Sequence, residues 1–308
     1  MKNKGVAYTV LVMMLWGLLF PMVKKGYEVF GVGSGMEAVG DILTFAGVRF
    51  LICGVVISFY AFVKNKASFV PVKNHIGMVL LSGAFAIIFH YAFTYVGLNL
   101  TGGSKTAILK QLGTIFFICF AALFFPEDKL NLKKVIGLVL GICGIFAINI
   151  GKGSFNFGVG DILIIGASFC TVFSNVTSKK VFKYVEPITS TGVSQLFGGV
   201  VLLIFGAIIG GRPQKFIPTS FSQVFVFAII ILVSTISYCI WFLIVKKENL
   251  SKLFIIKFSE PLFSALFSFL IINEDIFKWQ YAVAFVLISL GIVVANLKEK
   301  SKDENKSY

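Results

Sequence analysis

The chain has 308 residues, of which 57% are hydrophobic and only 14% are charged. A soluble domain of this length needs more polar surface, and the apolar residues stand in blocks long enough to cross a bilayer, so we predict a polytopic membrane protein. The net charge of +14 does not indicate nucleic-acid binding, because the lysines lie in short loops between apolar blocks, where positive charge sets membrane orientation.

Ten apolar blocks follow one another along the chain. Backbone groups in lipid must be satisfied within a helix, so each block is predicted to be α-helical. The first block is kept as a span because no small-residue cleavage site of a signal peptide follows it. The predicted spans are 5–25, 41–63, 75–98, 102–125, 133–150, 159–179, 188–210, 221–245, 251–272 and 279–297. The tail 298–308 is predicted to be a disordered cytoplasmic segment.

Lysine and arginine are concentrated in alternate loops. The loops that hold Lys64, Lys133 and Lys246 are rich in them, whereas the loops on the other side, such as the one with Arg212, are poor. Positive loops stay inside, so we expect both termini to be cytoplasmic and the protein to be a multi-pass protein of the plasma (inner) membrane.

The second half of the chain repeats the first after a shift of 147 residues. Over 104–149 and 251–296, 14 of 46 positions are identical, and they include Lys110/Lys257 and Asp128/Asp275; the same shift places Tyr91 on Tyr238. Shared hydrophobicity does not explain matched charges. Each repeat has five spans, and because this number is odd, the second repeat enters the membrane in the opposite orientation to the first. Inverted repeats of this kind are found in many secondary transporters. We therefore predict an all-α fold of ten transmembrane helices in two inverted five-helix repeats, 1–150 and 151–297.

Several stretches carry a family resemblance. They are "LWGLLFPMVKK" in span 1, "YVGLNLTGGSKTAILKQLG" at spans 3–4, "FFPEDKLNLKKVIGLVLGICGIFAIN" in span 5 and "SEPLFSALFSFLIINEDIFKWQYAVAFVLISLGIVVAN" in spans 9–10. With the repeat, the chain resembles the drug/metabolite transporter superfamily in its ten-helix EamA-type branch. The resemblance implies export or exchange of amino acids and other small metabolites, with spans 1–4 and 6–9 around a central cavity and spans 5 and 10 peripheral. Many members have a proline in span 4 where this chain reads "KQLGTI", which leaves the kink of span 4 open.

Ionisable residues inside spans are candidates for a transport pathway, because they are costly to bury there. Helical spacing places Lys257, Glu260, Ser264 and Ser268 on one stripe of span 9, and Ser168, Thr171, Asn175 and Ser178 on one stripe of span 6. Such stripes face protein or water. Lys110 lies on a polar face of span 4, near mid-bilayer.

The intramembrane charges are predominantly positive. Arg49, Lys110, Lys257 and Glu260 leave an excess of positive charge at mid-membrane, which suits an anionic or carboxylate-bearing substrate. Alternatively, Lys257 and Glu260 form a structural i,i+3 ion pair, and Arg49 only anchors span 2. Glu260, Lys257 and His90 are the candidates for proton coupling, and a packed, hydrogen-bonded His90 is the alternative for that residue.

Neutral side chains complete the set of candidates. Trp16, Tyr91, Asn175, Tyr238 and Trp241 are predicted to line the substrate cavity, although aromatic residues in spans also serve packing alone. Glu127-Asp128 and the equivalent Glu274-Asp275 are interpreted as start signals of the helices that follow them.

The function predicted from these features is secondary-active transport of a small metabolite by alternating access. The expected substrate is an amino acid or another carboxylate-bearing compound, and protons are the candidate coupling ion. Export of cationic or neutral drugs and amines is an alternative, and an integral-membrane enzyme is a less favoured one. We expect no enzyme activity, metal or cofactor, because the chain lacks GxxxxGK[ST] and HExxH motifs. The expected partners are the metabolite and the lipid bilayer, with no nucleic acid, in a monomer or homodimer.

Overall fold

Apolar blocks form helices throughout the chain in the computed structural model, which describes residues 3–100, 106, 109–149, 157–273 and 279–297. The elements of the first half are α1 (Asn3–Val29), η1 (Met36–Ala38), α2 (Val39–Lys64), η2 (Lys66–Ser68), α3 (Phe69–Asn74), α4 (Ile76–Gly83), η3 (Ala84–Phe89), α5 (His90–Leu100), α7 (Gln111–Phe124) and α8 (Leu132–Asn149). Those of the second half are α9 (Val159–Val181), α10 (Pro187–Ile208), η4 (Pro213–Phe216), α11 (Phe221–Lys247), α12 (Leu250–Lys257), α13 (Glu260–Ile272) and α14 (Trp279–Asn296).

Within these described residues, eight helical segments are long and apolar enough to cross a membrane. Together with the shorter α7 and the 18-residue α8, they account for the ten predicted spans. The prediction of an all-α, polytopic membrane protein is confirmed. The tail 298–308 lies outside the described residues.

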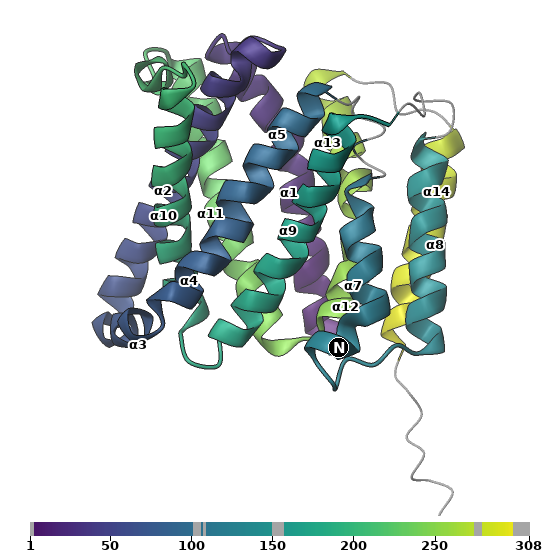
Figure 1. Ribbon diagram of the computed structural model, residues 1–308. Coiled ribbons are helices and arrows are strands. Elements are labelled where there is room, and N and C mark those ends of the chain that lie inside the picture. Colours follow the sequence, from purple (N-terminus) through teal and green to yellow (C-terminus); the bar gives the residue numbers. More distant parts are fainter. Residues whose placement is uncertain (1–2, 101–105, 107–108, 150–156, 274–278, 298–308) are drawn as a thin grey trace, which may run out of the picture.

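The two halves pack in an exchanged pattern. Helix α1 packs against α11 and α13, while its equivalent α9 packs against α5 and α7, which are the equivalents of α11 and α13 in the other half. Figure 1 shows α1 starting at the lower end of the molecule and α9 starting at the upper end, so these two helices run in opposite directions. Both observations agree with the predicted inversion of the second repeat.

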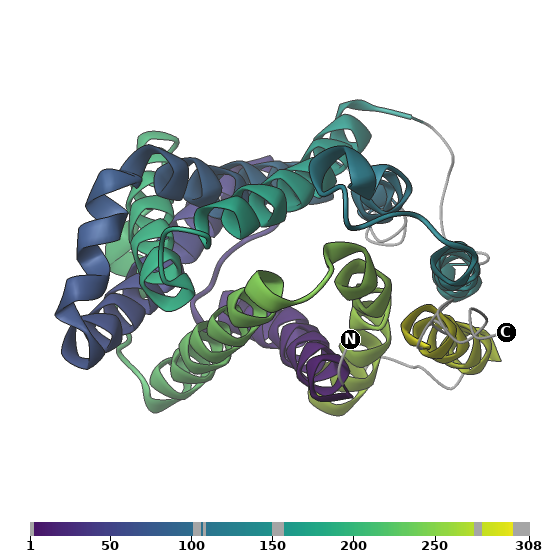
Figure 2. The ribbon, with the colours of Figure 1, turned by 90° about the horizontal axis from the view of Figure 1, so that it is seen from below.

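The last helices of the two halves lie apart from the rest. Helices α8 and α14 stand side by side at one edge of the molecule, and their main contacts are with one another (Figure 2). This is the peripheral position that the family resemblance implies for spans 5 and 10.

Glycine brings equivalent helices of the two halves into backbone contact. On α2 and α10, glycines recur every seven residues, at Gly40, Gly47 and Gly54 and at Gly192, Gly199 and Gly206. A Cβ atom added to Gly199 would lie 2.3 Å from the Leu51 backbone nitrogen, and one added to Gly47 would lie 2.5 Å from the Leu203 nitrogen. We call this contact the α2–α10 glycine seam. Small residues at such interfaces allow close packing in membranes, where no hydrophobic force draws helices together.

Gly199→Ala should therefore destabilise the protein. No flexible side chain can move aside for the new methyl group, and overpacking of this kind costs roughly 1–3 kcal/mol or more. Thermal unfolding in detergent checks this, with Gly77→Ala on α4 as the control, because nothing lies within 4 Å of a Cβ at that position. Equal melting temperatures for the two variants would contradict the close contact.

Two predicted spans are not continuous α-helices. Span 3 contains a π-helical segment, η3, directly before His90. Span 9 breaks between α12 and α13: Phe258 and Ser259 make i→i−3 backbone bonds to Ile255 and Ile256, and Pro261 stands in the first turn of α13. The predicted stripe of span 9 is thus divided, with Lys257 ending one helix and Glu260 starting the next.

Span 4 has a helix boundary at the equivalent place, because Lys110 is a turn residue and α7 begins at Gln111. The Lys110 backbone stays in the αR region, and its nitrogen donates to the Thr106 carbonyl oxygen. A kink is present further along the span without a proline, inside α7, where Phe120 has non-helical dihedral angles (φ −113°, ψ 16°).

The interpretation of Asp128 as a start signal for the next helix was wrong. Its carboxylate is buried, forms a 2.5 Å ion pair with Lys134, and accepts a hydrogen bond from the Ser251 backbone nitrogen at the start of α12. Helix α8 is capped instead by Asn131, whose Oδ1 accepts from the Lys134 backbone nitrogen. The contact between Asp128 and Ser251 spans 123 residues of sequence and joins the two halves, so no local pattern around Asp128 indicates it. Glu274 and Asp275 lie outside the described residues.

Candidate functional site

Four of the predicted aromatic residues meet at the centre of the molecule. The Trp16 ring lies 5.0 Å from Trp241 and 5.8 Å from Tyr238, centroid to centroid. The hydroxyls of Tyr91 and Tyr238 lie 3.0 Å apart and share a hydrogen bond. These two tyrosines are equivalent positions of the repeat, so the halves meet at this pair. We call the four residues the aromatic cluster.

Polar side chains fix the cluster. The buried indole nitrogen of Trp241 donates to Asn175 Oδ1 at 2.7 Å, which satisfies a donor that would be costly to leave unpaired. The buried Arg49 side chain donates from Nε to Ser234 Oγ at 2.9 Å, and its guanidinium carbon lies 4.8 Å from the Phe50 ring centroid and 5.9 Å from that of Tyr91. The side chains that contact the Arg49 guanidinium here, Ser234, Phe50 and Tyr91, therefore carry no charge.

Lys257 adds a second positive charge to this centre. Its ammonium lies 5.5 Å from the Trp16 ring centroid, which is a cation–π distance. Among the described residues, no carboxylate lies within 4.0 Å of Lys257 or of Arg49. The alternative of a structural Lys257–Glu260 ion pair is therefore not what the structure shows.

The break in span 9 explains how both charges are tolerated without direct pairing. Lys257 stands at the C-terminus of α12 and Glu260 at the N-terminus of α13. The negative end of a helix dipole favours a cation and the positive end favours a carboxylate. Each charge is thus stabilised by its own helix end.

Lys110 and His90 lie near the same centre. Lys257 lies within Coulombic range of Glu260 and of Lys110, although Glu260 is beyond ion-pair distance, and both lysines lie within Coulombic range of His90. His90 Nδ1 lies 3.1 Å from both the Ala167 carbonyl oxygen and Thr171 Oγ1. His90 is therefore packed and hydrogen-bonded, as its alternative interpretation states.

The predicted stripe of span 6 points into the protein. Ser168 Oγ accepts from the Gly113 nitrogen of α7 at 3.0 Å, and Ser178 Oγ lies 2.5 Å from Ser82 Oγ of α4. With Thr171 on His90 and Asn175 on Trp241, each member of the stripe contacts another span. The structure thus gathers Trp16, Arg49, Tyr91, Asn175, Tyr238, Trp241 and Lys257 at one centre. Glu260 lies one short turn away and forms no ion pair with the described residues.

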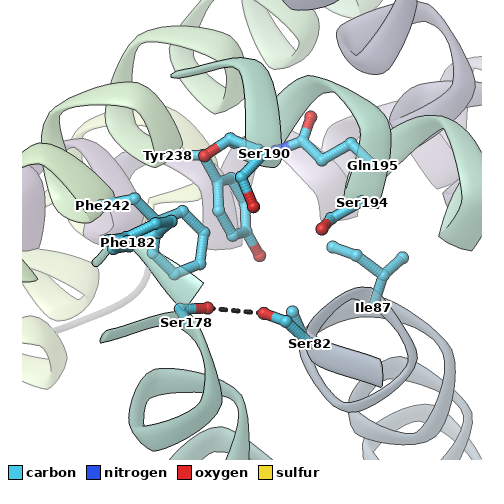
Figure 3. A pocket seen from close by; sticks show the side chains of 11 residues that line it. Ser82, Ile87, Ser178, Phe182, Ser190, Ser194, Gln195, Tyr238 and Phe242 are labelled. Atoms are coloured by element: carbon cyan, nitrogen blue, oxygen red, sulfur yellow. Dashed lines mark hydrogen bonds between the residues drawn. The ribbon is translucent and has the colours of Figure 1, made fainter. Parts of the chain in front are cut away.

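A small cavity beside this centre was not predicted. It has a volume of about 10 Å³ and is lined by Ser82, Ala86, Ile87, Ser178, Phe182, Ser190, Thr191, Ser194, Gln195, Tyr238 and Phe242 (Figure 3). Seven of the lining residues carry a hydroxyl or amide group, and four of these, Ser190, Thr191, Ser194 and Gln195, lie close together on α10. The run "TSTGVSQ" at 189–195 is unusually polar for a span, and this signal could have pointed to the site.

Similarity to known proteins is found over nearly the whole chain. The model of the EamA-like transporter family matches residues 3–150 and again 158–297. The chain belongs to the EamA-like transporter family. The two matches correspond to the two halves of the fold.

Several relatives of this EamA-like protein are uncharacterised transporters. The chain is 24% identical to the uncharacterised transporter YetK of Bacillus subtilis, covering 88% of this chain and 83% of YetK. It is also 24% identical to an uncharacterised transporter of Archaeoglobus fulgidus, covering 97% and 99% of the two chains. A crystal structure with 17% identity superposes with a TM-score of 0.76 over 96% of this chain and 97% of the other, which shows the shared fold. The protein is thus a membrane transporter by family.

Proposed function

We propose that this protein is a secondary-active transporter, an exporter or exchanger, of a small carboxylate-bearing or anionic metabolite, with amino acids as the first candidates. Alternating access between the two inverted halves is the proposed mechanism, without enzymatic chemistry. The observation that carries the proposal is that two cations, Lys257 over Trp16 and Arg49 over Phe50, lie against aromatic rings with no carboxylate of the described chain within ion-pair distance.

Uncompensated positive charge inside a membrane is expensive, and a bound anion removes much of this cost. Lys110 and Lys257 are proposed to attract the anionic group, together with Arg49. Helices α7 and α13 also begin at this depth, next to the two lysines, and the N-termini of interrupted helices favour anions in transporters. Trp16, Tyr91, Tyr238 and Trp241 are proposed to line the site, with Asn175 holding Trp241 in place.

The aromatic cluster by itself would also suit an organic cation, because cations bind over aromatic rings. This supports the alternative of an exporter of cationic or neutral drugs and amines. Lys257 and Arg49 already occupy such positions over Trp16 and Phe50, and they would repel a further cation. We therefore favour the anionic substrate.

Proton coupling is the proposed source of energy, with Glu260 and Lys257 as the first candidates and His90 as a third. Purified protein in proteoliposomes should take up radiolabelled amino acids or organic acids, and an imposed pH gradient should change the rate. Uptake of amines with no uptake of any acid would overturn the anionic substrate. An uptake rate that does not change under the pH gradient would overturn the proposal that transport is coupled to protons.

The orientation with cytoplasmic termini, in the plasma (inner) membrane, also belongs to this proposal. In a variant without native cysteines, cysteine at Pro218, in the exposed loop before α11, should react with an impermeant maleimide in whole cells. Cysteine at Ala67, exposed between α2 and α3, should react only after the cells are permeabilised. The reverse labelling would overturn the orientation.

A further inference from the structure

The cavity of Figure 3 contains a glutamine with no protein partner. The Gln195 side chain is 1% exposed, and neither its amide nitrogen nor its amide oxygen has a hydrogen-bond partner among the described residues. A buried polar group left unpaired costs roughly 1–3 kcal/mol, so an unpaired donor and acceptor on one side chain are not expected from packing alone.

The surroundings of Gln195 are polar but uncharged. Ser82, Ser178, Ser190, Thr191 and Ser194 contribute hydroxyls to the wall, and Ala86, Ile87, Phe182, Tyr238 and Phe242 contribute the rest of the lining. An ion would be desolvated there without a counter-charge, which is costly. The chemistry favours a neutral group that both donates and accepts, and the volume of about 10 Å³ admits one group about the size of a water molecule.

The cavity adjoins the aromatic cluster through a single residue. Tyr238 lines the cavity and also packs against the Trp16 ring. The Lys257 ammonium lies over this same Trp16 ring. On the other side, the Ser82–Ser178 hydroxyl pair (dashed in Figure 3) joins α4 of one half to α9 of the other. The cavity therefore lies between two hydroxyl pairs, Tyr91–Tyr238 and Ser82–Ser178, and both pairs connect the two halves.

We propose that this cavity is a binding site for one uncharged hydroxyl group, and that Gln195 recognises it. This inference rests on the proposed function in one respect: the group is the neutral end of a compound whose anionic end is held near Lys257. The substrate class becomes a carboxylate that also carries hydroxyl groups, and a plain fatty acid is excluded from it.

Three six-carbon probes separate the two ends of such a compound. Gluconate has a carboxylate and hydroxyls, hexanoate has the carboxylate alone, and sorbitol has hydroxyls alone. Binding to the purified full chain is measured by thermal shift at constant ionic strength. We expect gluconate to bind at least ~10-fold more tightly than hexanoate, since a site built for a hydroxyl discriminates against the analogue that lacks it.

Gln195→Met is the decisive variant, because methionine is similar in length and has no strong donor or acceptor. Its preference for gluconate over hexanoate should fall to near parity, while hexanoate affinity stays unchanged. Without a probe it should melt at or above the wild-type temperature, since two unpaired groups are removed. The matched control is Gln280→Met on the peripheral α14, where the amide oxygen is also buried and unpaired; this variant should keep the preference.

Each result decides the inference. A preference retained in Gln195→Met, or a wild type without any preference for gluconate, would overturn it. A strongly lowered melting temperature of ligand-free Gln195→Met would make Gln195 a structural residue and overturn it as well. Ser190→Ala, which removes one hydroxyl of the wall, should weaken the preference severalfold even if the methionine variant does not fold. Sorbitol binding that depends on Gln195, with neither acid binding, would keep this site and reject the anionic substrate instead.

Discussion

Asp128→Asn is expected to lower the melting temperature of the protein by about 6–20 °C in detergent. The substitution leaves the Lys134 ammonium, which is 2% exposed, without its counter-charge, and breaking one side of a buried ion pair costs roughly 3–5 kcal/mol. A loss of each kcal/mol lowers the melting temperature by about 2–4 °C in domains of 150–250 residues. The cap on the Ser251 backbone nitrogen at the start of α12 weakens at the same time.

The neighbouring carboxylate provides the control for this prediction. Glu127 is exposed, so Glu127→Gln removes the same charge from the same loop at little cost. In the double variant Asp128→Asn/Lys134→Met no buried charge is left unpaired, so much of the lost stability should return. If Asp128→Asn and Glu127→Gln have the same melting temperature, the Asp128–Lys134 ion pair does not stabilise the protein.

Lys257→Met is expected to weaken substrate binding by about ten- to a hundredfold while protein yield stays near normal. Methionine keeps much of the apolar stem and removes a charge that is costly in the membrane. The lost charge-assisted hydrogen bond is worth roughly 1.5–3 kcal/mol, which gives this change in affinity. Substrate-dependent thermal shift is the measurement, with the acid identified by the uptake assay as the ligand. Lys25→Met is the control, because Lys25 pairs with the exposed Glu28 at the end of α1.

Lys110→Met should have a similar effect, and the double variant should lose much less than the two single losses together if both lysines hold one anion. Arginine at position 110 should restore binding poorly, because its planar guanidinium is larger and does not shed its proton. Lower yield and stability with unchanged ligand shifts in every lysine variant would make these residues structural and would remove the case for an anionic substrate.

Much of the architecture follows from periodicity and the internal repeat. The shift of 147 residues pairs Tyr91 with Tyr238, and the structure joins these two hydroxyls. The polar spacing of span 6 predicts inward contacts, and Ser168, Asn175 and Ser178 all make them. A side chain that must avoid lipid leaves a strong signal in the sequence, because few alternatives exist for it in a membrane.

Other features depend on contacts that no local pattern encodes. The break before Pro261 has a visible cause, but the kink at Phe120 in α7 has no proline, and the π-helical η3 has no marker in its run of apolar residues. Asp128 serves a helix start that lies 123 residues away along the chain. Gln195 was not predicted for a different reason: it is neutral, and the presence of an ionisable side chain inside a span does not select a cluster of neutral polar groups such as the one in span 7.

The α2–α10 glycine seam has a mechanical consequence. Helices separated by a layer of side chains can shear past one another, because rotamers adjust as they move. Where backbone touches backbone, as at Gly47 and Gly199, such adjustment is not available, and α8 and α14 meet in the same manner at Gly137 and Gly291. We therefore expect these two pairs to act as fixed pivots. Under the proposed alternating-access mechanism, the displacement that opens one side of the membrane then falls to the interrupted helices, where the backbone is already bent.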